Sequence, residues 1–596
     1  MTATQAGQPA KDPEDGGSGD ASVGAPVGDG SDVIDSGHGD VGGPGFDRTS
    51  AGHEAAGGTA ERIAALRARL ITPMPDDRLW GWILPLLVTA FAAFLRFNRL
   101  SIPESVIFDE TYYVKDAWSI LQHGVEWNML PSPTSNPNWL NNAIIAGKTN
   151  IFQSCSGTSC GEYVVQPPLG KLLIAVGEFF FGLTTLGWRF ASAVFGTAAV
   201  LVMARVTRRL TRSTLLGCIA GLLLSLDGLE FVLSRTGILD IFLMFFVLAS
   251  FGCLVVDRDV SRAKLAEAMV LRPTDEAGPW LGIRKWRVAA GILVGCAGAV
   301  KQDAVWYIFA YAGLCIAWDI GARRTVGLRS YVRGALVRDG KWLLLTLGVV
   351  PLITYVLTWT GWLVTNTGYD RDYAQANGVS NPVIAPFYSL FQYHIEIYQF
   401  MDGLSVRHPY MSQPWDWFFI TRPVAFYWNS YSDAAGQHLA KAGTTGPYVQ
   451  EVLAIGNPAI WWVSVPAMAV CLGWWLNRRD WRAGAALLGV AAGWASWLPF
   501  TSRTKFFYYA LEFEPFLIIC IVLCLGLILG PATARRGFEL TLGPTVRLAR
   551  RTIGAVVVGI YVLAVLIIFW YFYPILAGQV IPYSDWLSHM WYSGWI

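Results

Sequence analysis

The chain has 596 residues, of which 53% are hydrophobic, 14% aromatic and only 15% charged. Soluble domains usually carry about 25% charged residues, so this composition excludes an ordinary soluble protein and indicates an all-α polytopic membrane protein. A formal net charge of +2 is too small to indicate nucleic-acid binding.

The N-terminal 60 residues are mainly Gly, Asp and Ser, with almost no aromatic side chains. Such a segment buries too little apolar surface to offset the entropy lost on ordering, so residues 1–60 are expected to form a disordered cytoplasmic tail. The next segment, 61–78, places Ile63, Leu66 and Leu70 on one helical face. It predicts either a short amphipathic helix on an anionic membrane surface or a frayed linker.

Residues 79–596 form the predicted membrane domain. A spanning helix needs about 20 mostly apolar residues. Eleven stretches qualify, at 80–98, 188–206, 213–231, 237–256, 288–302, 304–320, 342–360, 457–476, 482–500, 510–530 and 553–573. A twelfth apolar stretch, 167–182, is interpreted as a helix lying at the outer surface, because counting it as a span would scramble the charge pattern.

Basic residues predict the orientation. Arg and Lys gather in five loops, at 205–212, 258–287, 323–341, 478–482 and 535–551. With eleven spans, all five loops fall on one side, which the positive-inside rule makes cytoplasmic. The N-terminus is then cytoplasmic, the C-terminus is extracytoplasmic, and the long segments 99–187 and 361–456 face outward.

Cysteine usage agrees with this orientation. Of nine cysteines, seven lie within predicted spans, and the other two, Cys155 and Cys160, lie close together in the first outer segment. An oxidising compartment favours a disulfide that closes this small loop. Two free thiols are the alternative.

Ionisable groups gather at the outer ends of the spans. Charges at membrane depth are costly and indicate function, unless the side chains snorkel to the interface. The first outer segment holds the adjacent carboxylates Asp109 and Glu110, and the topology brings six cations to the same level, namely Arg96, Arg189, Arg235, Lys301, Arg503 and Lys505. Cations could bind an anionic phosphate headgroup while a carboxylate deprotonates an incoming hydroxyl. The simpler alternative is that these charges pair with one another and with lipid headgroups.

Seven motifs in chain order resemble the protein O-mannosyltransferase family. They are FDETYYVKDAWS (108–119), QPPLGKLL (166–173), GWRFASAVFG (187–196), SRTGILDIFLMFF (234–246), GAVKQDAVW (298–306), HPYMSQPWDW (408–417) and SRTKFFYYALEFEPF (502–516). The resemblance runs from about residue 80 to the C-terminus and implies the GT-C membrane glycosyltransferase fold. The chain looks like the bacterial, actinobacterial form, since segment 361–456 is too short for the β-rich domain of eukaryotic members. Gln166 stands where the family usually has His, which puts a role for that position in doubt.

The resemblance implies transfer of mannose from polyprenyl-phosphate mannose to Ser or Thr hydroxyls of secreted or membrane proteins. The reaction would invert the anomeric carbon at the extracytoplasmic face of the cell membrane. Asp109 would be the general base, and Glu110 would hold the acceptor peptide or shape the site. The donor phosphate would be bound by Arg189 and Lys301, with Arg503 and Lys505 as further candidates. The rest of the site would comprise Arg96, Arg235, Lys171, Gln166 and His408. Membrane lipids and the secretion translocon are the other expected partners.

Two points remain open at this stage. The chain has no clear metal-ligand pattern, so no cofactor is firmly expected, and a divalent metal at His408 is the minor alternative. The rival functions are a related GT-C transferase that acts on a lipid or glycan and a transporter or flippase of lipid-linked sugars. Transporters usually show two similar halves with midplane sites. The absence of such a repeat in the sequence favours the transferase.

Overall fold

The computed structural model describes residues 48–133, 136–155, 160–272, 274–440, 446–530, 539–542 and 546–596. The chain divides into a unit that ends at Gly57 and a second unit, Gly58–Ile596, which carries every feature discussed below. Residues 1–47 of the predicted tail lie outside the described residues.

The first helix, α1, spans Arg48–Leu70, so it begins before the predicted boundary at residue 61. Its sequence is rich in Ala, the strongest helix former, although its Gly residues oppose a helix. At the C-terminal end of α1, Leu70 is buried in a small apolar cluster with Leu265 and Ala322. This end is therefore a packed helix and not a frayed linker.

Seven helical segments among the described residues are long and apolar enough to cross a membrane. They are α2 (Trp80–Phe97), α6 (Thr185–Thr211), α9 (Asp240–Leu271), α11 (Val305–Thr325) with the turn from Gln302, the segment Tyr331–Thr358, α19 (Pro458–Arg478) and α22 (Arg550–Leu576). The segment Tyr331–Thr358 comprises α12 (Tyr331–Gly334), α13 (Lys341–Leu344) and α14 (Val350–Thr358), joined by π-helical turns. The chain is thus a multi-pass membrane protein.

The remaining predicted spans form shorter helices. They are α7 (Thr214–Ser225), α8 (Gly228–Leu233), α10 (Lys285–Val300), α20 (Trp481–Trp494) and α21 (Glu514–Leu529). Each of the eleven predicted spans therefore coincides with helix, while the number that cross the membrane and the orientation stay predictions. Buried Asp227 separates α7 from α8, because it accepts hydrogen bonds from the backbone N–H groups of Leu229 and Glu230 and so caps α8.

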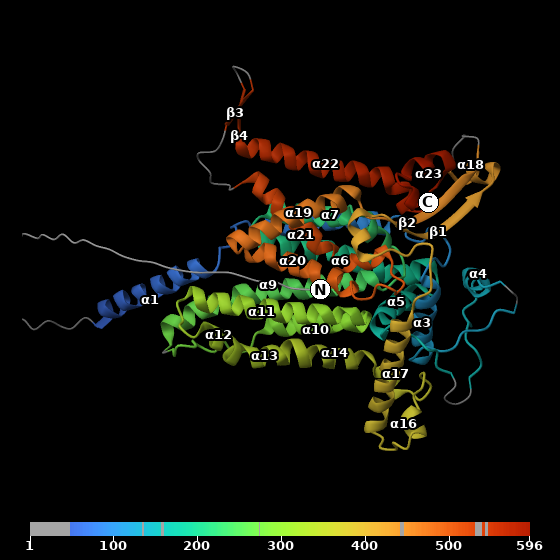
Figure 1. Cartoon of the computed structure of the whole chain (residues 1–596), viewed down its shortest axis with the longest axis horizontal. Coiled ribbons are helices and arrows are strands. Elements are labelled where there is room, and N and C mark those ends of the chain that lie inside the picture. Colours follow the sequence, from blue (N-terminus) through green and yellow to red (C-terminus); the bar gives the residue numbers. More distant parts are fainter. Residues whose placement is uncertain are drawn as a thin grey trace, which may run out of the picture. The chain divides into compact units, whose positions relative to one another are not determined.

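In Figure 1 the long helices α9, α10 and α11 run side by side, and α3, α5 and β1 lie together at one end, called the site end below. The helices of this end and of its loops are α3 (Glu110–His123), α4 (Trp139–Ile145), α5 (Pro168–Phe181), α15 (Thr360–Val364), α16 (Tyr373–Ala376), α17 (Ile384–Gly403), α18 (Asp433–Ala440) and α23 (Tyr583–His589). Helix α5 has 14 residues. Its length does not decide between a span and a surface helix, because α20, which coincides with a predicted span, also has 14 residues, so the surface position of α5 stays a prediction.

A small antiparallel sheet adds to this helical fold. Its strands are β1 (Val424–Tyr431), β2 (Tyr448–Ala454) and β5 (Val580–Pro582), in the order β1-β2-β5. All seven residues of β2 are buried, as expected for a central strand. The all-α prediction did not include this sheet, nor the hairpin of β3 (Glu539–Leu542) and β4 (Val546–Ala549).

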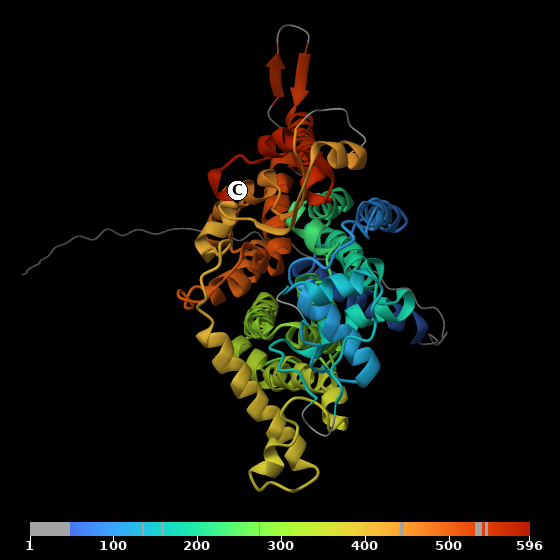
Figure 2. The same cartoon turned by 90° about the vertical axis from the view of Figure 1, so that its right-hand side faces the viewer.

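Two features hold the segments that are predicted to face outward in a defined structure. Figure 2 looks onto the site end, where α17 projects away from the long helices. Apolar residues near its middle, including Tyr393 and Ile397, pack on Trp359 and Trp362. In the first outer segment Cys155 and Cys160 are joined by a disulfide, with their Cα atoms 5.3 Å apart.

Candidate active site

The adjacent carboxylates Asp109 and Glu110 lie at the start of α3 in different surroundings. Glu110 is completely buried, whereas Asp109 is partly exposed. The residue before them, Phe108, has φ = 45°, in the left-handed region that a bulky side chain rarely adopts. Such backbone strain persists only where surrounding contacts hold it, and it often occurs at functional sites.

Glu110 is held by four hydrogen bonds. Arg189 donates from Nε and Nη2 at 2.8 and 3.0 Å, and the backbone N–H groups of Ile107 and Gly237 donate at 2.9 and 2.8 Å. The other donors of Arg189 bind the carbonyl oxygens of Leu100, Pro103 and Ser105. Arg189 is completely buried and has no donor left for a phosphate, so the prediction that it binds the donor is wrong. The pair instead anchors the loop before α3, which leaves Glu110 the role of shaping the site.

Asp109 is only lightly held. Its Oδ2 accepts one hydrogen bond, at 3.1 Å, from the hydroxyl of Tyr508. Burial raises the pKa of Asp109 to about 6, although Lys301 and the hydrogen bond from Tyr508 act in the opposite direction. A carboxylate with this pKa is a stronger base than an ordinary aspartate and is still ionised at neutral pH.

Lys301 follows α10 and approaches the same tyrosine. Its ammonium is paired with Asp240 at 2.8 Å. It lies 5.9 Å from the ring centre of Tyr508 and 4.9 Å from that of Tyr509, within the range of cation–π attraction. Tyr508 therefore contacts both the candidate base and the candidate phosphate ligand.

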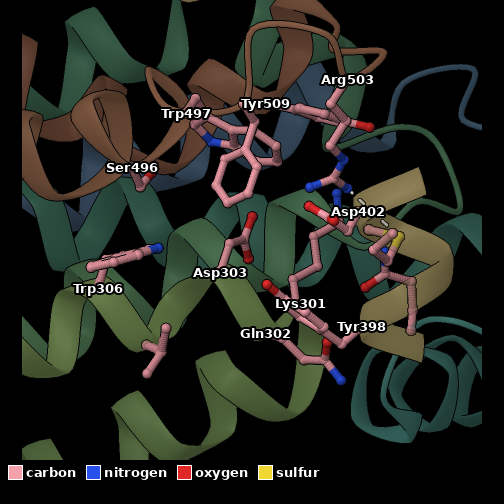
Figure 3. Close-up of a pocket in the computed structure, with 14 residues that line it drawn as sticks. Lys301, Gln302, Asp303, Trp306, Tyr398, Asp402, Ser496, Trp497, Arg503 and Tyr509 are labelled. Atoms are coloured by element: carbon pink, nitrogen blue, oxygen red, sulfur yellow. Dashed lines mark hydrogen bonds between the residues drawn. The ribbon is translucent and has the colours of Figure 1, made fainter. Parts of the chain in front are cut away.

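A cavity of about 310 Å³ adjoins this group. In Figure 3 Lys301, Gln302 and Asp303 form one wall, Trp497, Arg503 and Tyr509 form another, and Tyr398 and Asp402 approach from α17. Arg503 stacks 5.0 Å from the ring centre of Trp497, and its Nη2 lies 3.6 Å from the sulfur of Met401. In the part of the chain that the structure describes, Arg503 forms no ion pair, so its guanidinium is free to bind an anion.

Two predicted site cations have structural roles. Arg96 is completely buried and pairs with Glu230. Arg235 donates to the carbonyl oxygens of Leu95, Arg96, Asn98 and Arg99. It therefore caps the C-terminal end of α2, where a cation also complements the helix dipole. Neither residue lines the cavity, so their place among the other site residues stays a prediction.

Of the other predicted residues, two are held by partners within the protein, one lines the cavity and one is exposed outside it. Lys171 is buried and paired with Glu126 at 2.5 Å, and Lys505 is buried with its ammonium on the carbonyl oxygen of Phe500. Each ammonium is held by a partner within the protein and neither lines the cavity, so their roles in the site stay predictions. Gln166 does line the cavity. His408 is exposed outside it, 5.1 Å from the ring of Phe506.

Across the described ranges, no group of three or more His, Cys, Asp or Glu side chains could hold a metal ion. A divalent metal at His408 therefore stays a prediction without geometric support.

The site contains residues that the sequence analysis did not assign, chiefly Tyr508, Tyr509, Asp240 and Asp303. Tyr508 and Tyr509 belong to a 3-10 turn, Phe507–Glu512. Their motif, SRTKFFYY, was a visible signal, because it places paired aromatics beside cations. It did not tell which tyrosine would face Asp109.

Two family models match the chain. The model described as dolichyl-phosphate-mannose-protein mannosyltransferase matches residues 86–360, and that of the C-terminal four TMM region of protein-O-mannosyltransferase matches residues 386–595. A polyprenol-phosphate-mannose–protein mannosyltransferase of Mycobacterium tuberculosis is 36% identical over 535 residues, covering 87% of this chain and 93% of the relative. The chain belongs to the protein O-mannosyltransferase family.

Other relatives agree with this membership. A protein of the same name from Corynebacterium glutamicum is 31% identical, covering 90% of this chain and 98% of the relative. Among solved structures, the Saccharomyces cerevisiae protein O-mannosyltransferase Pmt1-Pmt2 complex bound to the sugar donor matches with a TM-score of 0.63 at 14% identity. The match covers 90% of this chain and 94% of that one, which shows a shared fold, the GT-C fold.

Proposed function

We propose that this mannosyltransferase-family protein transfers mannose from polyprenyl-phosphate mannose to Ser or Thr hydroxyls of secreted or membrane polypeptides, at the extracytoplasmic face of the plasma membrane. One observation carries the proposal. Asp109 and Lys301 meet at Tyr508, beside a cavity bordered by Arg503. Tyr508 thus lies between a candidate base and a cation, and a second cation lines the adjoining cavity, which is the set of groups that transfer from a phosphate to a hydroxyl requires.

The residues support a single displacement. Asp109 takes the proton of the acceptor hydroxyl as its oxygen bonds to the anomeric carbon, and the bond from that carbon to the phosphate oxygen breaks. Lys301 and Arg503 stabilise the charge that remains on the phosphate. Because no covalent intermediate forms, the anomeric configuration inverts.

The lipid tail of the donor has a route away from the cavity. Val305 and Trp306, which line it, lie in the first turn of α11 and are 41% and 46% exposed, and Phe309 on the next turn is 65% exposed. An exposed apolar helix face suits a polyprenyl chain, whose transfer from water is favourable. On the other side of the cavity, the aromatic side chains of Trp497 and Tyr509 provide a rigid surface against which the sugar can pack.

The activity is tested with membranes that contain the protein, polyprenyl-phosphate mannose and a Ser/Thr-rich peptide. We expect the peptide to gain one hexose, and Asp109→Asn membranes and a peptide with Ala at its Ser/Thr positions to show no gain. Hexose in the lipid or glycan fraction would instead favour a different acceptor. Movement of the donor across the membrane without its consumption would favour a flippase.

The face of the membrane is tested separately. A thiol reagent that cannot cross membranes should label a cysteine introduced at Asn138 in intact cells and should not label one at Arg329. The reverse pattern would place the site in the cytoplasm and refute the extracytoplasmic assignment. Co-purification with the secretion translocon would test the proposed coupling to protein export.

A further inference from the structure

Among the described residues, strand β1 pairs with another strand along one edge only. It pairs with β2 from Val424↔Ala454 to Tyr431↔Tyr448, and β2 lies between β1 and β5. Each strand has two hydrogen-bonding edges. Among the residues that the structure describes, the backbone of β1 forms hydrogen bonds to no element other than β2. The second edge of an eight-residue strand is therefore open to another extended chain.

This edge begins beside the candidate base. The ring of Phe426, in β1, stacks on that of Phe108, with centres 4.5 Å apart and planes 5° apart, and Phe108 directly precedes Asp109. Phe426 also lies 5.6 Å from the ring of Tyr508, whose hydroxyl binds Asp109. The pairing register shifts at this point, between Ala425 and Tyr427. Such bulges often lie next to active sites, where they redirect side chains.

We propose that the acceptor polypeptide binds in an extended conformation as an added strand on the free edge of β1, with its acceptor Ser or Thr beside Phe426. This inference rests on the proposed function and deepens it. Neighbouring strands lie about 4.8 Å apart and side chains alternate between faces, so a hydroxyl on the face of Phe426 points toward Asp109. Recognition through main-chain hydrogen bonds accepts many sequences, because every residue except Pro offers the same groups.

An acceptor fits this edge better than a second copy of the chain does. The edge of β1 is interrupted by a bulge and lies next to the aromatic side chains that surround Asp109. Edges that pair between two copies of a chain are usually long and flat. The side chains of Trp428 and Ser430, farther along β1, are exposed, whereas Val424 and Phe426 are buried.

The first experiment is an N-methyl scan of a mannosylated acceptor peptide. Methylation of a backbone nitrogen removes one donor without changing the side chain. If the peptide adds to β1, KM should rise about two- to tenfold at every second residue and stay unchanged at the residues between, with kcat within twofold. A uniform effect, or none, would overturn strand addition.

The second experiment uses two proline variants of β1. The N–H groups of Asn429 and Ser430 point to opposite edges, because they are consecutive in one strand. Asn429→Pro and Ser430→Pro should therefore differ. The variant that loses the N–H pointing away from β2, the outward variant, should fold and show a raised KM for the peptide, with unchanged donor affinity. The variant that loses the N–H pointing toward β2 should weaken the pairing of β1 with β2. A folded outward variant with wild-type KM would contradict the proposal.

The outcomes separate the inference from the function on which it rests. If the unmodified peptide gains no hexose, the proposed function fails and the inference falls with it. If the peptide is mannosylated but shows no alternation, strand addition alone is wrong. Cross-links between two copies through β1 that leave peptide KM unchanged would assign the edge to self-association and likewise overturn the inference.

Discussion

The anchor formed by Glu110 and Arg189 and the cavity bordered by Lys301 and Arg503 both combine carboxylates with cations at the site end. In the anchor every donor of Arg189 has a partner within the protein, and both side chains are completely buried. Near the cavity and within the described residues, Asp109 accepts one hydrogen bond, and Arg503 contacts the sulfur of Met401 and the ring of Trp497 without forming an ion pair. The presence of a charged side chain therefore does not by itself indicate a functional residue. A charged side chain near a cavity that still has hydrogen-bonding atoms without a partner does.

The largest effect is expected from the base. Asp109→Asn keeps the shape of the side chain but removes the proton acceptor, so turnover should fall about 10²–10⁴-fold with donor affinity largely unchanged. Mannose transfer and donor binding are measured separately. Wild-type turnover in this variant would mean that another residue acts as the base. Asp109 would then not differ from Glu110 in taking part in the chemical step.

Substitutions in the anchor of Glu110 and Arg189 should lower the stability of the protein and not act on the chemical step. Arg189→Ala leaves Glu110 buried without its counter-charge, which costs about 3–5 kcal/mol in the free energy of unfolding. Thermal unfolding in detergent measures the loss. The double variant Glu110→Gln/Arg189→Met removes both charges and should lose less than the single variant. A stable Arg189→Ala protein with weak donor binding would return Arg189 to the phosphate site.

The cavity cation should act on the donor alone. Arg503→Ala removes one charge-assisted contact and should weaken donor binding by about 1.5–3 kcal/mol, with unchanged thermal stability. Arg407, exposed outside the cavity, supplies the matched control, and Arg407→Ala should bind donor like the wild type. Equal losses in both variants would indicate a general electrostatic effect and no specific site.

The smallest effect concerns the pH profile. Turnover requires ionised Asp109, whose pKa is about 6, so the rate should be half-maximal near pH 6, fall at lower pH and approach a plateau at higher pH. Tyr508→Phe removes a hydrogen bond that favours the ionised form, while Lys301 and Asp240 still act on Asp109 with opposite signs. The acidic limb should therefore move to higher pH. An unmoved limb would mean that Tyr508 packs against Asp109 without positioning its charge, and Tyr509→Phe is the control.

The sequence was a good guide to the helices and to the family, and a poor guide to the roles of individual cations. Among the predicted residues, Lys301, Arg503 and Gln166 line the cavity. Lys301 is also buried and paired, with Asp240, but it lines the cavity, whereas the cavity lining does not include Arg96, Arg189, Arg235, Lys171 or Lys505. All lie in similar motifs at similar predicted depth. Burial and pairing depend on the atoms around each group, which a motif does not report.

The sequence by itself determined the membrane character, the positions of the apolar helices and the adjacent carboxylates after the first of them, because hydropathy and charge patterns are local properties of the chain. The tertiary structure alone decided that Glu110 is saturated with hydrogen bonds and that Asp109 is bound by the hydroxyl of Tyr508. The partners involved are distant, since Glu110 and Arg189 are 79 residues apart and Asp109 and Tyr508 are 399 apart. It also decided that β1 keeps a free edge beside Phe108, because an unpaired edge is defined by the strands that do not cover it.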